Sequence, residues 1–200
     1  MGLHWMVAWA TAAPHSPAAS KDHFVTDQQT IADLLKPHIR DVPDFPIPGI
    51  LFRDITTLLA NADLFQQTVN AMASPFSDVD KVVVIESRGF ILGTPIAYVL
   101  GAGVVPVRKP GKLPAETFSA SYDLEYGTNE LQIHTDAIAP GERILIVDDL
   151  LATGGTLEAT ISLVEQLGGE IVGVSVLAEL LDLNGRAHTR GYDVHALIAY

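Results

Sequence analysis

Cysteine is absent from this sequence of 200 residues. The chain therefore has no disulfides, no thiolate nucleophile, and no zinc or iron–sulfur site built on cysteine. Charged residues are scarce, at 18%, and 12 Lys and Arg against 24 Asp and Glu leave a net charge of −12. A chain this acidic repels nucleic-acid backbones, so we expect no nucleic-acid partner. An anionic small substrate would then require a local basic patch.

Long hydrophobic runs are missing as well. The apolar runs at Val82–Ile85 and Ile144–Val147 are far shorter than the ~20 residues of a membrane span, so we expect no membrane partner. The first residues have no basic segment ahead of their apolar ones, and we do not interpret them as a signal peptide. We expect residues 1–22 to form a disordered extension, residues 23–200 to form a single domain, and the protein to be cytoplasmic.

Apolar, β-branched runs alternate with amphipathic runs along the chain. Continuous apolar runs are typical of strands buried on both faces, which form parallel sheets covered by helices. Four such strands are predicted, at Lys81–Glu86, Gly103–Val107, Arg143–Asp148 and Glu170–Leu177. Helices are predicted over Thr26–Arg40, Asp63–Ser74, Gly89–Leu100 and Thr156–Leu167. This alternation predicts an α/β fold with a doubly wound, mostly parallel sheet.

Two segments depart from this alternation. Val42–Ile50 contains three prolines, which predict a stiff, irregular path. Residues 109–135 form a long connection in which Ser119–Tyr126 and Glu130–Thr135 are predicted to pair as a hairpin across Gly127–Asn129. Connections of this length inside a domain are often lids, so we interpret 109–135 as a flexible lid.

The most informative stretch is Ile146–Thr156. Asp148 and Asp149 close a predicted strand and are followed by Ala152-Thr153-Gly154-Gly155-Thr156. The two glycines let backbone N–H groups converge, and the helix that follows attracts an anion at its N-terminus. Carboxylates repel a phosphate but suit vicinal sugar hydroxyls, so the stretch predicts a ribose 5-phosphate site. No Lys is present in the turn, which excludes a P-loop, and no G-x-G-x-x-G follows a strand.

The stretch Ile146–Thr156 resembles the phosphoribosyl-diphosphate signature of the type I phosphoribosyltransferases. Further segments narrow the resemblance to members that use adenine: Asp44–Asp54, Glu86–Phe90, Val107–Pro114 and Ser121–Gly127. The resemblance extends from about Thr26 to Leu180. It implies the type I fold, with a flexible lid hairpin and a small N-terminal hood. It also implies a pentosyltransferase of purine salvage that converts adenine and 5-phosphoribosyl 1-diphosphate to AMP and diphosphate.

The resemblance also implies roles for individual residues. The ribose hydroxyls and the 5-phosphate are assigned to Asp148, Asp149, Ala152, Thr153, Gly154, Gly155 and Thr156. The diphosphate is assigned to Ser87, Arg88, Arg108, Lys109 and Lys112. Adenine is assigned to Leu51, Phe52, Arg53 and Leu180. Glu125 is the candidate general acid/base near N7 of adenine, and Tyr126 lies beside it on the lid. A cis peptide bond is implied between Glu86 and Ser87.

Mg²⁺ is the implied cofactor. The seven histidines are scattered, so we expect no fixed protein site for the metal, and Mg²⁺ arrives with the diphosphate, since it sheds its water reluctantly. In relatives the loop after Val107 can reach a partner subunit, which implies a homodimer. Pro110 stands where relatives often carry Arg, so this chain has one cation fewer in that loop.

Two alternatives stay open. A related enzyme could use hypoxanthine, guanine or xanthine, but a 6-oxo base needs a donor facing its oxygen, often a lysine, and Leu177–Leu183 contains none. A regulator that senses phosphoribosyl diphosphate would need a DNA-binding element, and Met1–Lys21 is too short and too weakly basic to be one.

Overall fold

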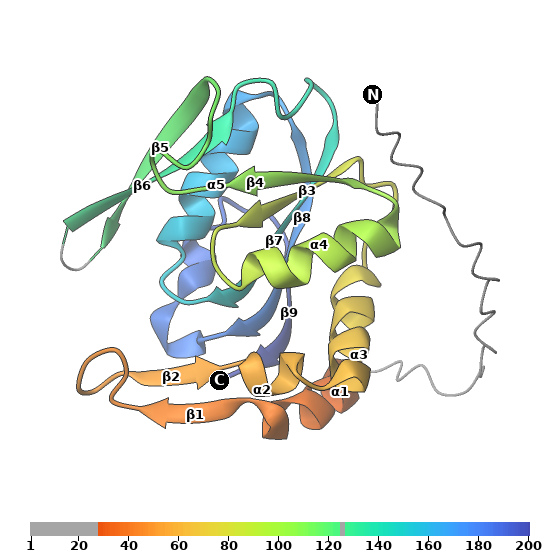
Figure 1. The fold of residues 1–200 in the computed structure, drawn as a ribbon, viewed down its shortest axis with the longest axis vertical. Helices are drawn as coiled ribbons and strands as arrows, with labels where there is room; N and C mark the ends of the chain where they lie inside the picture. Colours follow the sequence, from red (N-terminus) through yellow and green to blue (C-terminus); the bar gives the residue numbers. More distant parts are fainter. Residues whose placement is uncertain (1–27, 125–126) are drawn as a thin grey trace, which may run out of the picture.

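The computed structural model describes residues 28–124 and 127–200, and its centre is a five-stranded parallel sheet (Figure 1). The strands lie in the order β4-β3-β7-β8-β9, and every neighbouring pair is parallel. Their bounds are β3 Lys81–Ile85, β4 Gly103–Val107, β7 Arg143–Leu151, β8 Glu170–Glu179 and β9 Val194–Ala199. The predicted α/β fold with a doubly wound parallel sheet is confirmed.

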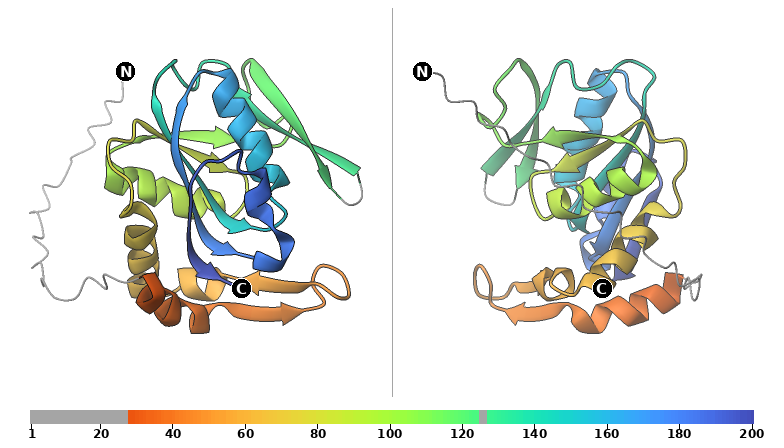
Figure 2. Two further views of the ribbon diagram at one scale, coloured as in Figure 1. Left: turned by 180° about the vertical axis from the view of Figure 1, so that it is seen from behind. Right: turned by 45° about the vertical axis from the view of Figure 1, so that its right-hand side comes forward.

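Helices cover both faces of this sheet. Helix α4 (Gly89–Leu100) lies in front of it in Figure 1, and the view from behind in Figure 2 brings α5 (Gly155–Gln166) to the front. Alternate strand residues point to opposite faces: Val82 and Val84 pack with α4, whereas Val83 and Ile85 pack with α5. Each of these buried side chains stabilises the fold by roughly 1.5–3 kcal/mol.

The remaining helices come mostly before β3 and after β8. They are α1 Gln28–Leu35, α2 Thr56–Leu59, α3 Ala62–Ala73 and the 3₁₀ turns Lys36–His38, Leu181–Leu183 and Gly185–His188. Helix α3 begins where predicted because the Asn61 side chain accepts hydrogen bonds from the backbone N–H groups of Asp63 and Leu64. The predicted helix that was to end at Arg40 ends at Leu35 instead, because the chain tightens into a 3₁₀ turn that contains Pro37. Within the described ranges, no helix is both long and apolar enough to span a bilayer.

A second sheet consists of β1 (Arg40–Pro43) and β2 (Leu51–Asp54), which pair antiparallel. We call this pair the hood; it lies across the lower end of the molecule in Figure 1. The prediction of an irregular path over Val42–Ile50 was therefore wrong at its first residues. Pro43 is tolerated because it ends its strand, and the reversal is closed by the backbone N–H of Gly49, which donates to the Asp44 carboxylate.

The predicted hairpin is confirmed as β5 (Thr117–Leu124) and β6 (Gly127–His134), which project at the upper left of Figure 1. Its reversal was misplaced, because Leu124 pairs with Gly127 and the residues expected to turn belong to β6. The root of the hairpin is joined to the main sheet by two backbone hydrogen bonds between Arg108 and Gln132.

Candidate active site

The strands of the main sheet are all parallel, so the segments that follow them all begin at the same side of the sheet, where the carboxyl ends of the strands lie. We call this side the sheet edge. Strand β7 continues to Leu151, beyond its predicted end, because its last residues pair with β8. Strand β3 pairs with β7 only as far as Val147. Asp148 and Asp149 therefore lie beside the turn that leaves β3, and the structure brings Ser87 and Arg88 of that turn to them.

The two acids share the hydroxyl of Ser87. Its Oγ lies 2.6 Å from Asp148 Oδ1 and 3.1 Å from Asp149 Oδ1, and it accepts a hydrogen bond from the N–H of Gly89. One hydroxyl has one hydrogen to donate. Burial, and then the charge of Asp149, raise the pKa of Asp148 well above its ordinary value. Asp148 therefore holds a proton more readily than an ordinary aspartate does.

The first residue of α4 comes unusually close to these acids. A Cβ on Gly89 would lie 2.7 Å from Asp148 Oδ1 and 3.2 Å from the Asp148 backbone, so a larger residue would displace the Asp148 carboxylate from its present position. The positive end of the helix dipole therefore faces the carboxylates, where it favours negative charge. The glycine at this position is required by packing at the site.

Arg88 connects the sheet edge to the hood. Its Nη2 lies 2.7 Å from Oδ2 of Asp149, whose side chain is only 5% exposed. Its guanidinium carbon lies 5.1 Å from the centre of the Phe52 ring. The sequence had assigned Arg88 to the diphosphate alone. Its contacts with a candidate ribose residue and a candidate adenine residue depend on how the hood approaches the sheet, which no local pattern reveals.

The phosphate turn forms a tight cradle after β7. Gly154 has φ +91° and is the N-cap residue of α5, so no side chain caps this helix end. A Cβ there would lie 2.5 Å from the carbonyl oxygen of Gly185 and 2.8 Å from Cβ of His188. Ala152, Thr153 and other turn residues line a cavity of about 80 Å³, several times what one water needs. The first N–H groups of α5 have no partner within the helix and are free to bind an anion.

The hood presents the candidate base residues. Leu51 is exposed, and the ring of Phe52 packs edge-on against Phe45 at 5.1 Å between centres. Arg53 forms an ion pair with Asp41 across the hood.

Arg53 also contacts Tyr200, which sequence reasoning missed. The guanidinium carbon of Arg53 lies 4.0 Å from the centre of the Tyr200 ring. The carbonyl of Tyr200 accepts a hydrogen bond from the N–H of Leu181, next to the candidate Leu180. Tyr200 thereby joins the hood to the end of β8. A tyrosine far from every motif gave no signal that could have marked it.

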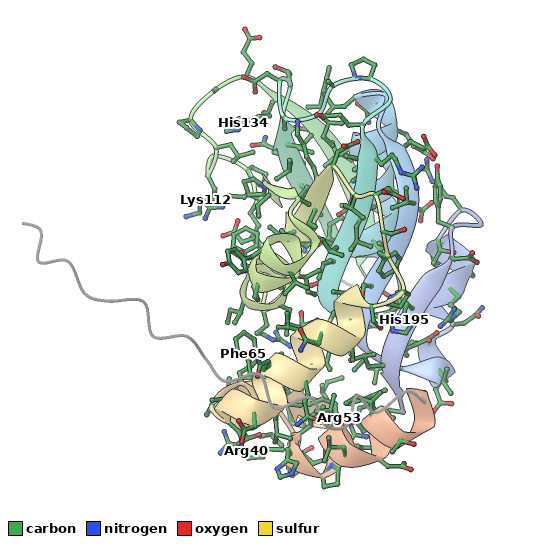
Figure 3. All side chains as sticks on the ribbon, turned by 90° about the vertical axis from the view of Figure 1, so that its right-hand side faces the viewer. Arg40, Arg53, Phe65, Lys112, His134 and His195 are labelled. Atoms are coloured by element: carbon green, nitrogen blue, oxygen red, sulfur yellow. The ribbon has the colours of Figure 1, made fainter. Side chains whose placement is uncertain are left out.

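The predicted diphosphate residues come from two segments that meet at Glu86, whose carboxylate accepts hydrogen bonds from Arg108 and from the N–H of Lys109. Arg108 forms two hydrogen bonds, of 3.1 and 3.2 Å, to Glu86, and these bonds lower the pKa of that carboxyl. Lys109 and Lys112 are exposed. In Figure 3, Lys112 lies well above Arg53, which belongs to the hood, along the long axis of the molecule. Of the five residues, Ser87 and Arg88 reach the acid pair.

The lid residues, the implied cis peptide bond and the metal remain to be considered. Glu125 and Tyr126 lie outside the described residues, so their roles stay predictions. The implied cis peptide between Glu86 and Ser87 was wrong, because the only cis bond among residues 28–124 and 127–200 is Phe45–Pro46. No group of three or more His, Asp or Glu able to hold a metal occurs in those same ranges.

Comparison with known proteins gives a consistent result. The model of the phosphoribosyl transferase domain matches residues 54–196. An adenine phosphoribosyltransferase from Halothermothrix orenii is 56% identical over 166 residues, which cover 82% of this chain and 98% of that protein.

Solved structures agree. A crystal structure of adenine phosphoribosyltransferase from Rhodothermus marinus has a TM-score of 0.82 and 52% identity, covering 86% of this chain and 99% of its own. The enzyme from Saccharomyces cerevisiae, with a TM-score of 0.80 and 40% identity, covers 84% and 99% of the two chains. That enzyme was crystallised with an imino-altritol bisphosphate and adenine.

Proposed function

Because this chain belongs to the phosphoribosyltransferase family, and within it to the adenine phosphoribosyltransferases, we propose that its site transfers ribose 5-phosphate from 5-phosphoribosyl 1-diphosphate to adenine. The products are AMP and diphosphate. The observation that carries this proposal is the meeting of three features at one sheet edge: the acid pair Asp148–Asp149, the glycine cradle at Gly154, and the ring of Phe52.

The sugar is bound from two sides. The cradle from Ala152 to Thr156 offers free N–H groups and the positive end of a helix dipole to the 5-phosphate. Asp148 and Asp149 accept hydrogen bonds from the ribose hydroxyls, because carboxylates accept strongly and repel a phosphate. A sugar held at both ends presents its C1 in a fixed direction, which lowers the entropic part of the barrier.

The base is bound on the hood. Adenine stacks on Phe52, where base–aromatic stacking is worth about 1–3 kcal/mol. The backbone of Leu51 faces its exocyclic amine, Arg53 lies beside them, and Leu180 closes the pocket. Adenine reacts as its N7–H tautomer, in which N9 carries the free lone pair. The N9–C1 bond forms as the C1–oxygen bond to diphosphate breaks, and the N7 proton passes to a base. Glu125 is the proposed general acid/base at N7, an effect worth roughly 10²–10⁴-fold.

Mg²⁺ bound to the diphosphate would neutralise charge on the leaving group, without a fixed site on the protein. The carboxylates of the site support a metal that is bound mainly by the diphosphate, because both side-chain oxygens of Asp149 already contact Ser87 or Arg88. Ser87, Arg88, Lys109 and Lys112 are the proposed neighbours of the diphosphate, whereas Arg108 is committed to Glu86.

The test is an assay of AMP formation from adenine and 5-phosphoribosyl 1-diphosphate with Mg²⁺, run beside hypoxanthine, guanine and xanthine. We expect adenine alone to be converted efficiently. Preference for a 6-oxo purine would overturn the choice of base. Tight binding of the sugar diphosphate without conversion of any base would favour a regulator instead.

We further propose a homodimer. The outer face of α4 and the edge strand β4 expose apolar side chains, namely Ile91, Tyr98, Val99 and Val104. Covering such a patch with a second copy removes apolar area from water. Light scattering on a size-exclusion column should give twice the chain mass, and V99E should halve it, whereas an exposed polar control, Q166E, should not. The cytoplasmic location and the boundary at residue 22 stay predictions.

A further inference from the structure

Arg88 occupies a position between two proposed subsites. Its guanidinium contacts the buried carboxylate of Asp149 on one side and faces the ring of Phe52 on the other. Asp149 is proposed to hold the sugar, and Phe52 is proposed to stack on the base. One side chain therefore touches both halves of the site.

The space above Phe52 is too narrow for a base while Arg88 is there. Stacked groups need about 3.5 Å per layer, so a base lying between ring and guanidinium would need about 7 Å. The guanidinium carbon is 5.1 Å from the ring centre. Adenine can reach this face of Phe52 only after Arg88 has moved.

The charge of Asp149 holds Arg88 in place. A carboxylate with 5% exposure needs a partner, because an unpaired buried charge is strongly destabilising. Asp148 brings no positive charge to the pair, and burial, followed by the charge of Asp149, raises its pKa. Ser87 offers only one hydrogen between the two acids. Arg88 is thus the counter-ion of this pair when no sugar is present.

The vicinal hydroxyls of a sugar can replace Arg88 as the partner of Asp149. Two vicinal hydroxyls can donate hydrogen bonds to the acid pair, after which Asp149 no longer depends on the guanidinium. Arg88 is then released from above the ring.

We propose that Arg88 is a positioning residue that makes the base subsite depend on the sugar subsite, by covering Phe52 until a ribose 5-phosphate displaces it from Asp149. The inference rests on the proposed function and deepens it. Its consequence is an energetic coupling: sugar phosphate binding strengthens adenine binding, by the 5- to 150-fold typical of coupled sites.

Calorimetry tests this with ribose 5-phosphate, which carries the diol and the 5-phosphate but no diphosphate to attract Arg88. Adenine is titrated into the full chain with and without saturating ribose 5-phosphate. In the wild type, the sugar phosphate should lower the adenine dissociation constant at least fivefold. In Arg88→Ala, adenine alone should already bind at least fivefold more tightly than to the wild type, and the sugar phosphate should add little.

Asp149→Asn tests the same ion pair by changing the partner of Arg88. Its nearly isosteric side chain keeps the site filled but releases the guanidinium, so adenine alone should bind more tightly while ribose 5-phosphate binds more weakly. This variant decides the matter if Arg88→Ala does not fold. The matched control is Arg143→Ala, which breaks the 3.1 Å pair with Glu170 at the other end of β7 and should behave like the wild type.

Unchanged or weaker adenine binding in either folded variant would overturn the proposal, and so would undiminished coupling in Arg88→Ala. Failure of the proposed function is separate: it is scored by AMP formation in the wild type. If the wild type forms AMP but the variants bind adenine as the wild type does, only the proposed role of Arg88 is contradicted.

Discussion

The turn at Gly154 permits the sharpest prediction, for the substitution Gly154→Ala. The residue has φ +91°, and its missing Cβ would lie 2.5 Å from the carbonyl oxygen of Gly185. That oxygen belongs to backbone, which cannot rotate away as a side chain tip can. The substitution therefore strains its own residue and also displaces the 3₁₀ turn packed against the cradle.

The two costs can be added. A left-handed conformation costs a non-glycine residue roughly 1–2 kcal/mol, and forcing extra volume into a packed contact costs about 1–3 kcal/mol. We expect Gly154→Ala to lower the free energy of unfolding by about 2–5 kcal/mol. Turning even one N–H group away from the 5-phosphate should also weaken ribose 5-phosphate binding roughly tenfold to hundredfold, since hydrogen bonds to charged groups contribute about 1.5–3 kcal/mol.

Gly141→Ala is the matched control. Gly141 has φ +85°, but a Cβ there meets nothing within 4 Å, so this variant should lose only about 1–2 kcal/mol and bind ribose 5-phosphate normally. Urea unfolding measures the first quantity and calorimetry the second. If the two variants lose equal stability and bind the sugar phosphate equally well, the close approach at Gly154 has no energetic weight and the reasoning fails.

Three further predictions concern catalysis, pH and the base subsite. Glu125→Gln should lower kcat by roughly 10²–10³, and turnover like the wild type would remove this residue from the mechanism. Burial lowers the pKa of His195 below its ordinary 6.5. As the pH drops through 6.5, the unfolded chain therefore takes up this proton before the folded chain does, and the free energy of unfolding falls. His195→Gln should reduce this dependence of stability on pH in urea titrations, whereas the exposed control His38→Gln should keep it. Tyr200→Ala removes the ring beside Arg53 and should raise the adenine KM about two- to fivefold, from a cation–π contact worth about 0.5–1 kcal/mol. The KM for the sugar diphosphate should not change, and an equal rise in both constants would contradict the assignment.

The parallel sheet was predictable because its strands are buried on both faces. A continuous run such as Lys81–Ile85 has few other stable arrangements than a covered central strand. Strand β9 was missed because Val194–Ala199 is short and contains His195, and its burial depends on α3 packing over it. The resemblance implied the hood, but its strands were not predicted, because the prolines between them favour irregular structure and the pairing joins Arg40–Pro43 to Leu51–Asp54 across that segment.

The sugar subsite was predictable to a greater extent than the rest of the site. Asp148 through Thr156 are consecutive, so their chemistry and their geometry are encoded locally. The contact of Arg88 with Phe52 joins the turn after β3 to the hood, and the pairing of Arg108 with Glu86 joins the residues that follow β4 and β3. Such contacts depend on how separate elements approach one another, which hydrophobic period and turn chemistry do not specify.

The division of the site between two sheets has an evolutionary consequence. Three of the residues proposed to recognise the base, Leu51, Phe52 and Arg53, lie on the hood, whereas those proposed to hold the sugar and its 5-phosphate lie on the main sheet and in the turn after β7. Substitutions between Asp44 and Arg53 can therefore alter which purine is accepted while the apparatus for the common pentose donor stays intact. A new specificity can arise on one small ribbon, with Arg88 as the contact through which the two parts must remain compatible.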